Sequence, residues 1–129
     1  MVQKILVVDD VGEQVEIAST MLRKLGYRVE TAVSGAKAVE LVRRQAFDLL
    51  VLDLIMPGGL DGLETYEEII RLYPQQKAII TSGYSASERV KRLQKLGAGI
   101  YVQKPYSMEA LGIAVRQELD RPQGTHPAS

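Results

Sequence analysis

The chain contains no cysteine and only one histidine, His126, which lies in a polar segment near the C-terminal end. Without cysteine there are no disulfides, no thiolate metal ligands and no cysteine nucleophile. His126 stands in a segment without apolar periodicity, and we expect it to be neither a metal ligand nor a catalyst. Any metal site is therefore expected to use oxygen ligands.

The chain also lacks an excess of charge of either sign. Its 16 Lys and Arg residues balance 16 Asp and Glu residues, and the sequence pI is about 6.6. This balance provides no global field that would attract nucleic acid or a membrane surface. We expect no signal peptide, and the sequence has no apolar run of membrane length. We therefore expect a soluble cytoplasmic domain that contacts neither nucleic acid nor a membrane.

Hydrophobic residues make up 46% of the 129 residues, which is enough for one core. A chain of this length suits a single domain. Apolar periodicity ends near Leu119, and the residues beyond Arg121 are polar or proline-rich. We expect the domain to span residues 1–121 and residues 122–129 to form a disordered tail.

Short apolar runs alternate with segments of helical periodicity along the domain. The helical segments carry one apolar face each; the first has Val15, Ala18, Leu22 and Leu25, and the last has Leu111, Ala114, Val115 and Leu119. Regular alternation with short loops predicts a parallel sheet that helices cover on both faces. The strands are expected at residues 4–8, 28–32, 49–52, 78–81 and 100–102.

The run at residues 28–32 alternates polar and apolar side chains, which is typical of an edge strand, whereas the first and third runs are apolar throughout. A doubly wound five-stranded sheet of order 2-1-3-4-5, with the flavodoxin-like three-layer αβα architecture, satisfies this pattern. The first and third strands then lie side by side where the strand order reverses. Ligands bind at such a point, outside the carboxyl ends of the strands.

Polar side chains follow four of the predicted strands. Asp9 and Asp10 follow the first strand, Asp53 the third, Ser82 the fourth and Lys104 the fifth. Because the carboxyl ends of parallel strands share one edge, we expect these side chains to converge. An aspartate after a strand often caps the next helix, and an Asp–Lys pair is often structural. The coincidence on four strand ends favours a functional site.

Three carboxylates in one crevice repel one another. Two unit charges roughly 4 Å apart interact by about 4 kcal/mol at an effective dielectric constant of about 20. Either a carboxyl is protonated, with a raised pKa, or a cation neutralises the cluster. Oxygen ligands favour Mg²⁺, which proteins commonly hold with a few carboxylates and a phosphate. With Lys104 and Ser82 alongside, the cluster predicts Mg²⁺-dependent phosphoryl transfer to a carboxylate.

These motifs resemble the receiver domain of bacterial two-component response regulators. The residues that carry the resemblance are Asp9-Asp10, Asp53, Ser82-Gly83 and Lys104-Pro105, and it extends over almost the whole chain. It implies that Asp53 accepts a phosphoryl group from a phosphohistidine. The donor would be a sensor histidine kinase or a histidine phosphotransfer protein.

The resemblance also implies a metal site and a switch. Asp10 and Asp53 would bind Mg²⁺ directly, Asp9 would do so through water, and the backbone carbonyl of Ile55 would be a further ligand. Lys104 would contact the phosphoryl group, and its peptide bond to Pro105 is typically cis. Ser82 would sense phosphorylation and Tyr101 would move between exposed and buried positions, so that the face built by the fourth helix, fifth strand and fifth helix switches. Without the resemblance, Tyr101 is simply an edge-strand aromatic that covers core.

One segment departs from the family pattern. Met56-Pro57 is followed by Gly58-Gly59-Leu60 before Asp61-Gly62, which is one residue more than usual. Ile55 precedes the insertion, so we expect metal binding to be retained in a longer, more flexible loop. In this family, the residues two after the phosphoacceptor and two after the switch hydroxyl border the path of the water that hydrolyses the aspartyl phosphate. In this chain they are Ile55 and Tyr84. Both are bulky, which predicts a long-lived phosphoryl group.

Residues 82–85 and 101–107 look most like receivers at the C-terminus of hybrid sensor histidine kinases. The parent protein is then such a hybrid kinase, a stand-alone receiver or a longer regulator. The fourth helical segment carries Arg89, Lys91, Arg92 and Lys95. This basic face is either solvated or a docking surface.

Two other functions remain open from the residues. A Mg²⁺-dependent phosphohydrolase could also work through an aspartyl phosphate, but it needs an acid/base carboxylate two residues after the nucleophile, where this chain has Ile55. A flavin-binding module could use the same strand order, but it needs a phosphate loop rich in serine and threonine after the first strand. The chain instead has Asp9-Asp10-Val11-Gly12, which repels phosphate unless a metal is bound.

Overall fold

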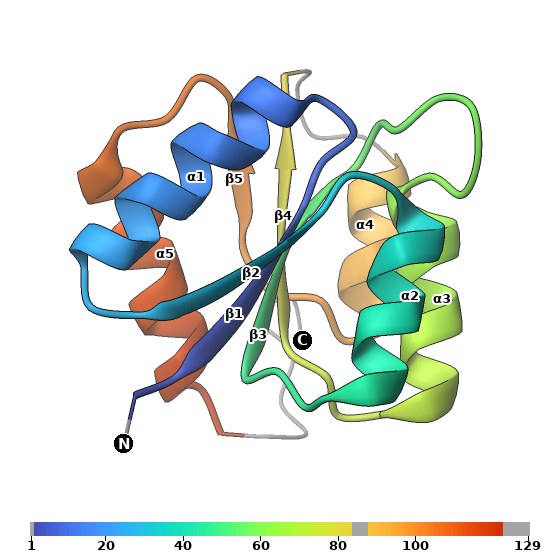
Figure 1. Ribbon diagram of the computed structural model, residues 1–129. Coiled ribbons are helices and arrows are strands. Elements are labelled where there is room, and N and C mark those ends of the chain that lie inside the picture. Colours follow the sequence, from blue (N-terminus) through green and yellow to red (C-terminus); the bar gives the residue numbers. More distant parts are fainter. Residues whose placement is uncertain (1, 84–87, 123–129) are drawn as a thin grey trace.

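The computed structural model describes residues 2–83 and 88–122. Five parallel strands form one sheet of order β2-β1-β3-β4-β5 between two layers of helices (Figure 1). The predicted fold class and strand order are confirmed. The strands are β1 (Lys4–Val8), β2 (Arg28–Ala32), β3 (Leu49–Asp53), β4 (Ala78–Ser82) and β5 (Tyr101–Gln103). The helices are α1 (Gly12–Lys24), α2 (Gly35–Arg44), α3 (Gly62–Leu72), α4 (Glu88–Lys95) and α5 (Met108–Asp120).

Helices α1 and α5 cover one face of the sheet, and α2, α3 and α4 cover the other (Figure 1). The central strands therefore bury both of their faces. In β1, Leu6 and Val8 belong to the core under α2, α3 and α4, whereas Ile5 and Val7 belong to the core under α1 and α5. This two-sided burial explains why the first and third runs are apolar at every position.

The edge strands differ from the central ones. In β2, Arg28 and Glu30 are exposed while Val29 and Ala32 are buried, as expected from the alternating pattern. Strand β5 pairs with β4 from Tyr101 onward, one residue later than predicted. Ile100 lies just before the paired residues of β5, and its carbonyl accepts a hydrogen bond from the Ile80 amide at 3.0 Å.

Three helices begin with a side-chain cap. Ser34 and Ser107 accept hydrogen bonds from the third residues of α2 and α5, as the sequence predicts. Helix α3 begins with a reciprocal capping box, in which Asp61 and Glu64 each bind the other's backbone amide. The cap determines where α3 starts after the unusual loop, and so which residues face the core.

The loop between β3 and α3 absorbs the extra residue without separating the two elements. Gly58 has a φ of +90°, which other residues rarely adopt. The Gly62 amide donates a hydrogen bond to the Leu54 carbonyl at 3.0 Å. A Cβ at Gly62 would lie 2.4 Å from the Asp53 carbonyl oxygen. Glycine at position 62 therefore lets α3 start directly against the end of β3.

One predicted core position, Leu25, is wrong, and another, Leu119, packs against the core while only partly buried. Leu25 follows the last residue of α1 and remains 43% exposed, because the helix ends before the turn that would bury it. At the end of α5 the buried residue is Glu118, whereas Leu119 is only partly buried. Glu118 can be buried because it forms an ion pair with Arg121, and Gly99 leaves room for its carboxylate.

No helix in residues 2–83 or 88–122 is long and apolar enough to cross a bilayer. Tyr84, His126 and residues 123–129 of the predicted tail lie outside the described residues. The sheet itself determines where a site can form, because all five strands point their carboxyl ends toward the same edge, at the top of Figure 1.

Candidate functional site

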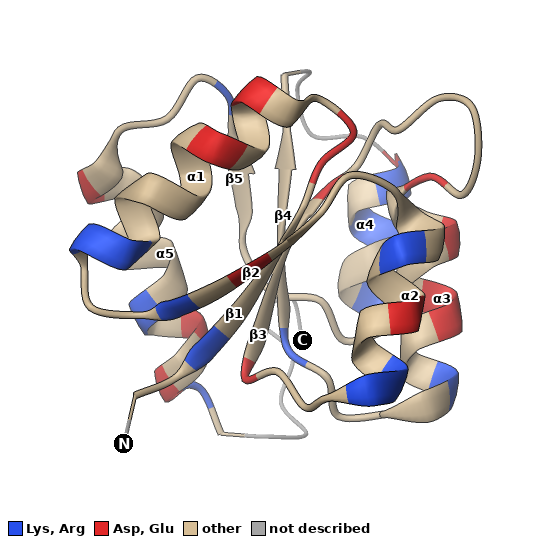
Figure 2. Cartoon of the chain, viewed as in Figure 1, with Lys and Arg blue, Asp and Glu red and all other residues tan. Residues whose placement is uncertain are grey.

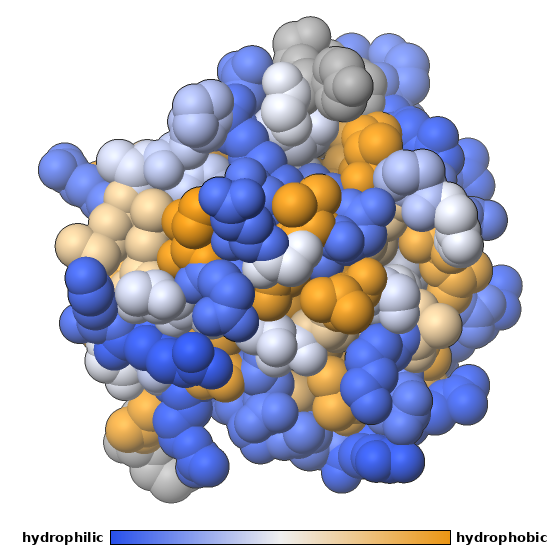
Figure 3. Space-filling view, turned by 45° about the horizontal axis from the view of Figure 1, so that its top comes forward, coloured by the Kyte–Doolittle hydropathy of each residue, from blue (hydrophilic) through white to orange (hydrophobic). Residues whose placement is uncertain are grey.

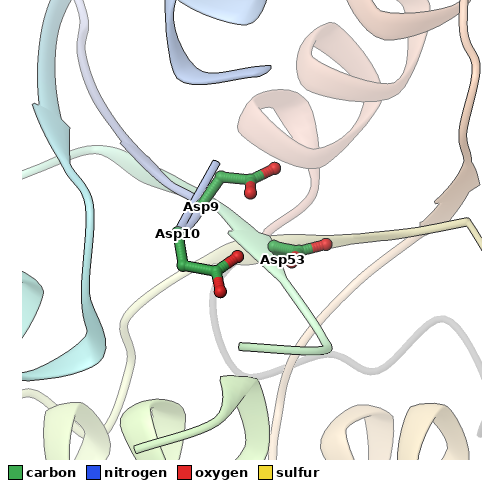
Figure 4. A group of neighbouring side chains, drawn as sticks. All are labelled: Asp9, Asp10 and Asp53. Atoms are coloured by element: carbon green, nitrogen blue, oxygen red, sulfur yellow. The ribbon is translucent and has the colours of Figure 1, made fainter. Parts of the chain in front are cut away.

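Three aspartates converge at the carboxyl edge of the sheet, as the sequence predicts. Strands β1 and β3 pair in register, with Val8 opposite Leu52, so Asp9 and Asp53 follow at the same level. One carboxylate oxygen from each of Asp9, Asp10 and Asp53 lies within 4.8 Å of the others. Figure 4 shows the three side chains turned toward one crevice.

Lys104 brings the fifth strand into this cluster. Its backbone amide donates a hydrogen bond to the Ser82 carbonyl at 2.8 Å, which holds the exit of β5 beside the end of β4. Its Nζ lies 2.5 Å from Oδ2 of Asp9 and 3.0 Å from Oδ1 of Asp53. The peptide bond between Lys104 and Pro105 is cis. One partly buried ammonium thus bridges two of the three carboxylates.

The three aspartates are not equivalent. Asp9 accepts a hydrogen bond from the Val11 amide at 3.0 Å through Oδ1, and its other oxygen faces Lys104. Asp9 is therefore partly a structural residue that shapes the entry into α1. Asp10 is more exposed than Asp9 or Asp53, and it makes no ion pair with any described residue. Asp53 is 6% exposed, and Lys104 supplies its ion pair.

The surroundings of Asp53 and Lys104 shift the pKa of both side chains. Burial raises the pKa of the Asp53 carboxyl from 3.8 to about 6; the charge of Lys104 opposes this shift, and the charge of Asp9 adds to it. Burial by itself lowers the pKa of Lys104. The hydrogen bond from Lys104 to Asp9 and the charge of Asp53 outweigh burial, so the pKa of Lys104 is raised overall. The ammonium therefore stays charged, and Asp53 keeps measurable affinity for a proton.

The donor set fits a hard divalent cation. With all three carboxylates ionised, one ammonium leaves the cluster with two uncompensated negative charges. The ligand atoms are oxygens, as Mg²⁺ prefers. Burial raises the pKa of Asp53 although the charge of Lys104 opposes the shift. A cation here would contact the accessible Asp10 and the buried Asp53.

Ser82 and Tyr101 lie on neighbouring strands beside the aspartates. Ser82 is the last residue of β4 and is 1% exposed. Asp53 pairs with Thr81 across β3 and β4, which places Ser82 one step beyond it at the same edge. Tyr101 begins β5 and packs, partly buried, against the core under α4. The structure thus places Ser82 at the same edge of the sheet as the aspartates and puts Tyr101 on the strand that leads to Lys104.

Two features near the site were not anticipated. Burial raises the pKa of the Tyr106 hydroxyl, the charge of Lys104 opposes this shift, and the charges of Asp9 and Asp53 add to it. The position of Tyr106, two residues after Lys104 in the sequence, could have indicated that it lies near the aspartates.

The second feature is an ion pair between helices: Arg89 on α4 pairs with Asp61, the cap of α3. Charge complementarity between an acidic third and a basic fourth helical segment could have indicated this contact.

The pairing of α3 with α4 bears on the basic face noted in the sequence. Figure 2 shows acidic residues on α3 and basic residues on α4. Arg92 lies 3.7 Å from Glu67, in addition to the Arg89–Asp61 pair. Part of the basic face is therefore engaged within the domain, and Lys91 and Lys95 remain on its solvent side.

Exposed hydrophobic side chains stand on the loops at this edge. Val11, Val33 and Ile55 are 50%, 55% and 41% exposed, and they follow β1, β2 and β3 respectively. Seen with this edge turned forward, the surface has hydrophobic patches set between hydrophilic ones (Figure 3). The loops at the edge that holds the acidic crevice therefore carry exposed apolar side chains as well as carboxylates.

Comparisons with known proteins agree on one family. The model of the response regulator receiver domain matches residues 5–116. The transcriptional regulatory protein ZraR of Klebsiella oxytoca is 36% identical over 115 residues, which are 89% of this chain and 26% of that protein. The chain thus spans about a quarter of the length of this relative.

Solved structures give the same result. A receiver domain protein described as CheY-like, from Methanospirillum hungatei JF-1, is similar with a TM-score of 0.86 and 28% identity, covering 93% of this chain and 95% of that one. NtrX from Brucella abortus is similar with a TM-score of 0.87 and 27% identity, covering 93% of this chain and 27% of that one.

Proposed function

This chain belongs to the response regulator receiver domain family, and on that premise we propose that it is the phosphoacceptor of a two-component signalling system, with Asp53 as the residue that is phosphorylated. One observation carries the proposal: Asp53 is buried in a cluster of three carboxylates and is bridged to Asp9 by the Lys104 ammonium. A purely structural ion pair would not need two further carboxylates beside it.

The chemistry follows from the charges of the cluster. A carboxylate oxygen of Asp53 attacks the phosphorus of a phosphohistidine, the bond from phosphorus to the imidazole nitrogen breaks, and the imidazole keeps that electron pair. A pKa of about 6 leaves Asp53 mostly ionised, and thus nucleophilic, at neutral pH. Lys104 lies 3.0 Å from Asp53, close enough for its ammonium to move onto the oxygens of the incoming phosphoryl group.

The aspartates that would bind a metal ion already lie close together. We propose that Asp10, Asp53 and the backbone carbonyl of Ile55 hold Mg²⁺, with Asp9 contacting it through water. When bound, the ion supplies positive charge that draws the phosphoryl oxygens toward Asp53. Asp10 is suited to meet the ion first, because it is the most accessible of the three aspartates and makes no ion pair with any described residue.

We propose that phosphorylation is read out by Ser82 and Tyr101. Ser82 is buried one residue beyond the strand partner of Asp53, so its hydroxyl can reach a phosphoryl oxygen. Tyr101 packs partly buried against the core under α4 and can take a deeper position if that side loosens. The face of α4, β5 and α5 would then change. A ligand shifts such an equilibrium only by its different affinity for the two states.

The phosphodonor we propose is a sensor histidine kinase or a histidine phosphotransfer protein in the cytoplasm. Three parents remain open. The likeness of residues 82–85 and 101–107 supports a hybrid histidine kinase, the similarity to ZraR supports a transcriptional regulator, and the similarity to the receiver domain protein of Methanospirillum hungatei supports a stand-alone receiver. Hydrolysis of the aspartyl phosphate would be slow, and the domain would relay or display the phosphoryl group rather than turn over a substrate.

The experiment uses a small phosphodonor. Incubation with acetyl phosphate and Mg²⁺ should add one phosphoryl group to the intact protein, as measured by mass spectrometry. Omitting Mg²⁺ or replacing Asp10 with Ala should abolish most of the uptake. As a matched control, Glu13→Ala changes an acidic residue in the first turn of α1 and should leave the uptake unchanged. Equal uptake by Asp10→Ala and wild type would refute the metal role.

A further inference from the structure

A buried ion pair at the end of α5 has no part in the chemistry proposed above. Glu118 is 1% exposed and pairs with Arg121, the C-cap residue of that helix. Arg121 donates a hydrogen bond from Nε to Oε1 of Glu118 at 3.2 Å, and another from Nη2 to the second carboxylate oxygen. The two side chains therefore form a forked, charge-assisted pair.

The carboxylate of Glu118 lies against the turn that joins α4 to β5. A Cβ at Gly99 would lie 1.9 Å from Oε1 of Glu118, so only glycine leaves room for the carboxylate there. Gly99 precedes β5, and its amide donates a hydrogen bond at 2.7 Å to the carbonyl of Ala78, the first residue of β4. The pair therefore lies at the amino edge of the sheet, opposite the edge that holds Asp53.

Arg121 also contacts the end of α4. Gly97 ends that helix with a φ of +119°; its amide donates to the Gln94 carbonyl, and the Ala98 amide donates to the Leu93 carbonyl, which is a Schellman motif. The Nη2 of Arg121 donates a hydrogen bond to the Gly97 carbonyl at 3.4 Å. One guanidinium thus joins the end of α4 to the end of α5.

Lys77 holds the same end of α5 to the sheet. It comes directly before β4, and its Nζ donates hydrogen bonds to the carbonyls of Leu119, at 2.9 Å, and of Arg121. The backbone of Arg121 is extended, and Pro122 cannot continue the helix because proline has no amide hydrogen. The chain therefore leaves α5 at a point that Lys77 ties to the sheet and Arg121 ties to α4.

Stability alone is a weak reason for this ion pair. Taking two charges out of water opposes folding, and apolar residues of similar volume often replace such a pair without loss of stability. The forked geometry, by contrast, admits few arrangements of the two side chains and keeps Arg121 directed at Gly97. Only two residues of α4 are buried, Val90 and Leu93, so packing leaves that helix few other restraints.

We propose that the Glu118–Arg121 pair couples α4 to the point where the chain leaves α5, so that a displacement of α4 is passed to the segment that follows Pro122. Lys77 is the fixed point of this device, because it holds the same carbonyls to the start of β4. The inference rests on the proposed function, since phosphorylation of Asp53 supplies the change in α4. It adds a route by which that change reaches the opposite edge of the sheet.

The test follows amide resonances while beryllofluoride, which mimics a phosphoryl group, binds at Asp53. In the wild type the mimic should shift the resonances of Ser82 and α4, and also that of Arg121. Glu118→Met with Arg121→Met replaces the pair with apolar residues and leaves no buried charge unpaired. In this double variant Ser82 and α4 should still respond, whereas the shift at position 121 should be lost.

A second variant covers the case in which the double variant does not fold. Arg121→Lys keeps a positive charge beside Glu118 but lacks the planar fork that binds Glu118 and Gly97 together, so the shift at position 121 should again be lost. Lys77→Met removes the tie to the sheet and should leave a shift at Arg121 at least as large as in wild type.

Glu68→Met with Arg71→Met is the matched control for the double variant. These residues form an ion pair of the same spacing on the exposed side of α3, and replacing them should leave the response of Arg121 unchanged.

The proposal is overturned if Ser82 and α4 respond in the wild type while Arg121 does not, if position 121 responds fully without the pair, or if the control variant loses the response as well. The absence of any response at Ser82 and α4 would be a different result. It would refute the switch in the proposed function, and the coupling with it.

Discussion

The Nζ of Lys104 lies 3.0 Å from Oδ1 of Asp53, although 50 residues separate the two along the chain. The contact exists because β3 and β5 flank β4 and end at the same edge of the sheet. It partly neutralises a carboxylate that burial would otherwise keep protonated. The predictions below test what this pairing, and the cluster around it, does.

Replacing Lys104 with Met should destabilise the protein in metal-free buffer, because the three carboxylates then lose their internal cation. The same change should enlarge the rise in melting temperature that Mg²⁺ produces, since the ion no longer competes with an ammonium. Lys95→Met, at the end of α4, is the control. A Mg²⁺-dependent rise equal to that of wild type would show that Lys104 does not neutralise the metal site.

Asp53→Asn should stabilise the metal-free protein at neutral pH. Folding raises the pKa of Asp53 from 3.8 to about 6, so the folded state binds more protons in that window and wild-type stability falls as the pH rises through it. With about 1.4 kcal/mol per pKa unit, and allowing for water in the open crevice, the gain should be about 1–2 kcal/mol. Urea unfolding measures it.

The pH dependence provides the check on that cause. Below 3.8 the carboxyl is protonated in both the folded and the unfolded state, so the advantage of Asp53→Asn should vanish there. An advantage that stays constant from neutral to acidic pH would mean that packing, rather than ionisation, is responsible.

Beryllofluoride, a mimic of the phosphoryl group, should perturb amide resonances beyond the site itself. We expect shifts along α4, at Ser82 and at Tyr101, because the mimic would draw the Ser82 hydroxyl toward Asp53 and change the packing next to α4. Asp53→Asn with beryllofluoride is the control. Shifts limited to residues next to Asp53 would indicate a carrier of phosphate without a switch.

The lifetime of the phosphoryl group should be shortened by polar residues at two positions. Ile55 is 41% exposed two residues after Asp53 and has no polar atom to orient a water molecule. The double variant Ile55→Asn, Tyr84→Glu should therefore lose phosphate faster than wild type; each tenfold in rate corresponds to about 1.4 kcal/mol in the barrier. Loss at the wild-type rate would show that these side chains do not control hydrolysis.

The fold was predictable because its signals are local and repeated. Apolar runs of strand length and helix caps at Ser34 and Ser107 indicate where the elements lie, and the alternating pattern of β2 indicates that it is an edge strand. The positions of Asp9, Asp53 and Lys104 followed from that order, because they come directly after strands. Convergence of the site was thus a consequence of topology.

The errors concern residues whose burial depends on more than the apolar period of one helix. Leu25 fits the apolar period of α1, but the helix ends before it, and the side chain lies exposed beside Gly112. Glu118 reads as a surface residue in any local pattern. Its burial depends on Arg121 and on the space at Gly99, and periodicity carries no information about either.

The central claim is that Asp53 carries the phosphoryl group. Borohydride reduces an aspartyl phosphate to homoserine, so peptide mass analysis after acetyl phosphate, Mg²⁺ and borohydride reveals the modified residue directly. We predict homoserine at position 53 and none at positions 9 or 10. Unmodified Asp53 in a protein that has taken up phosphate, or equal uptake by Asp53→Asn, would contradict the account.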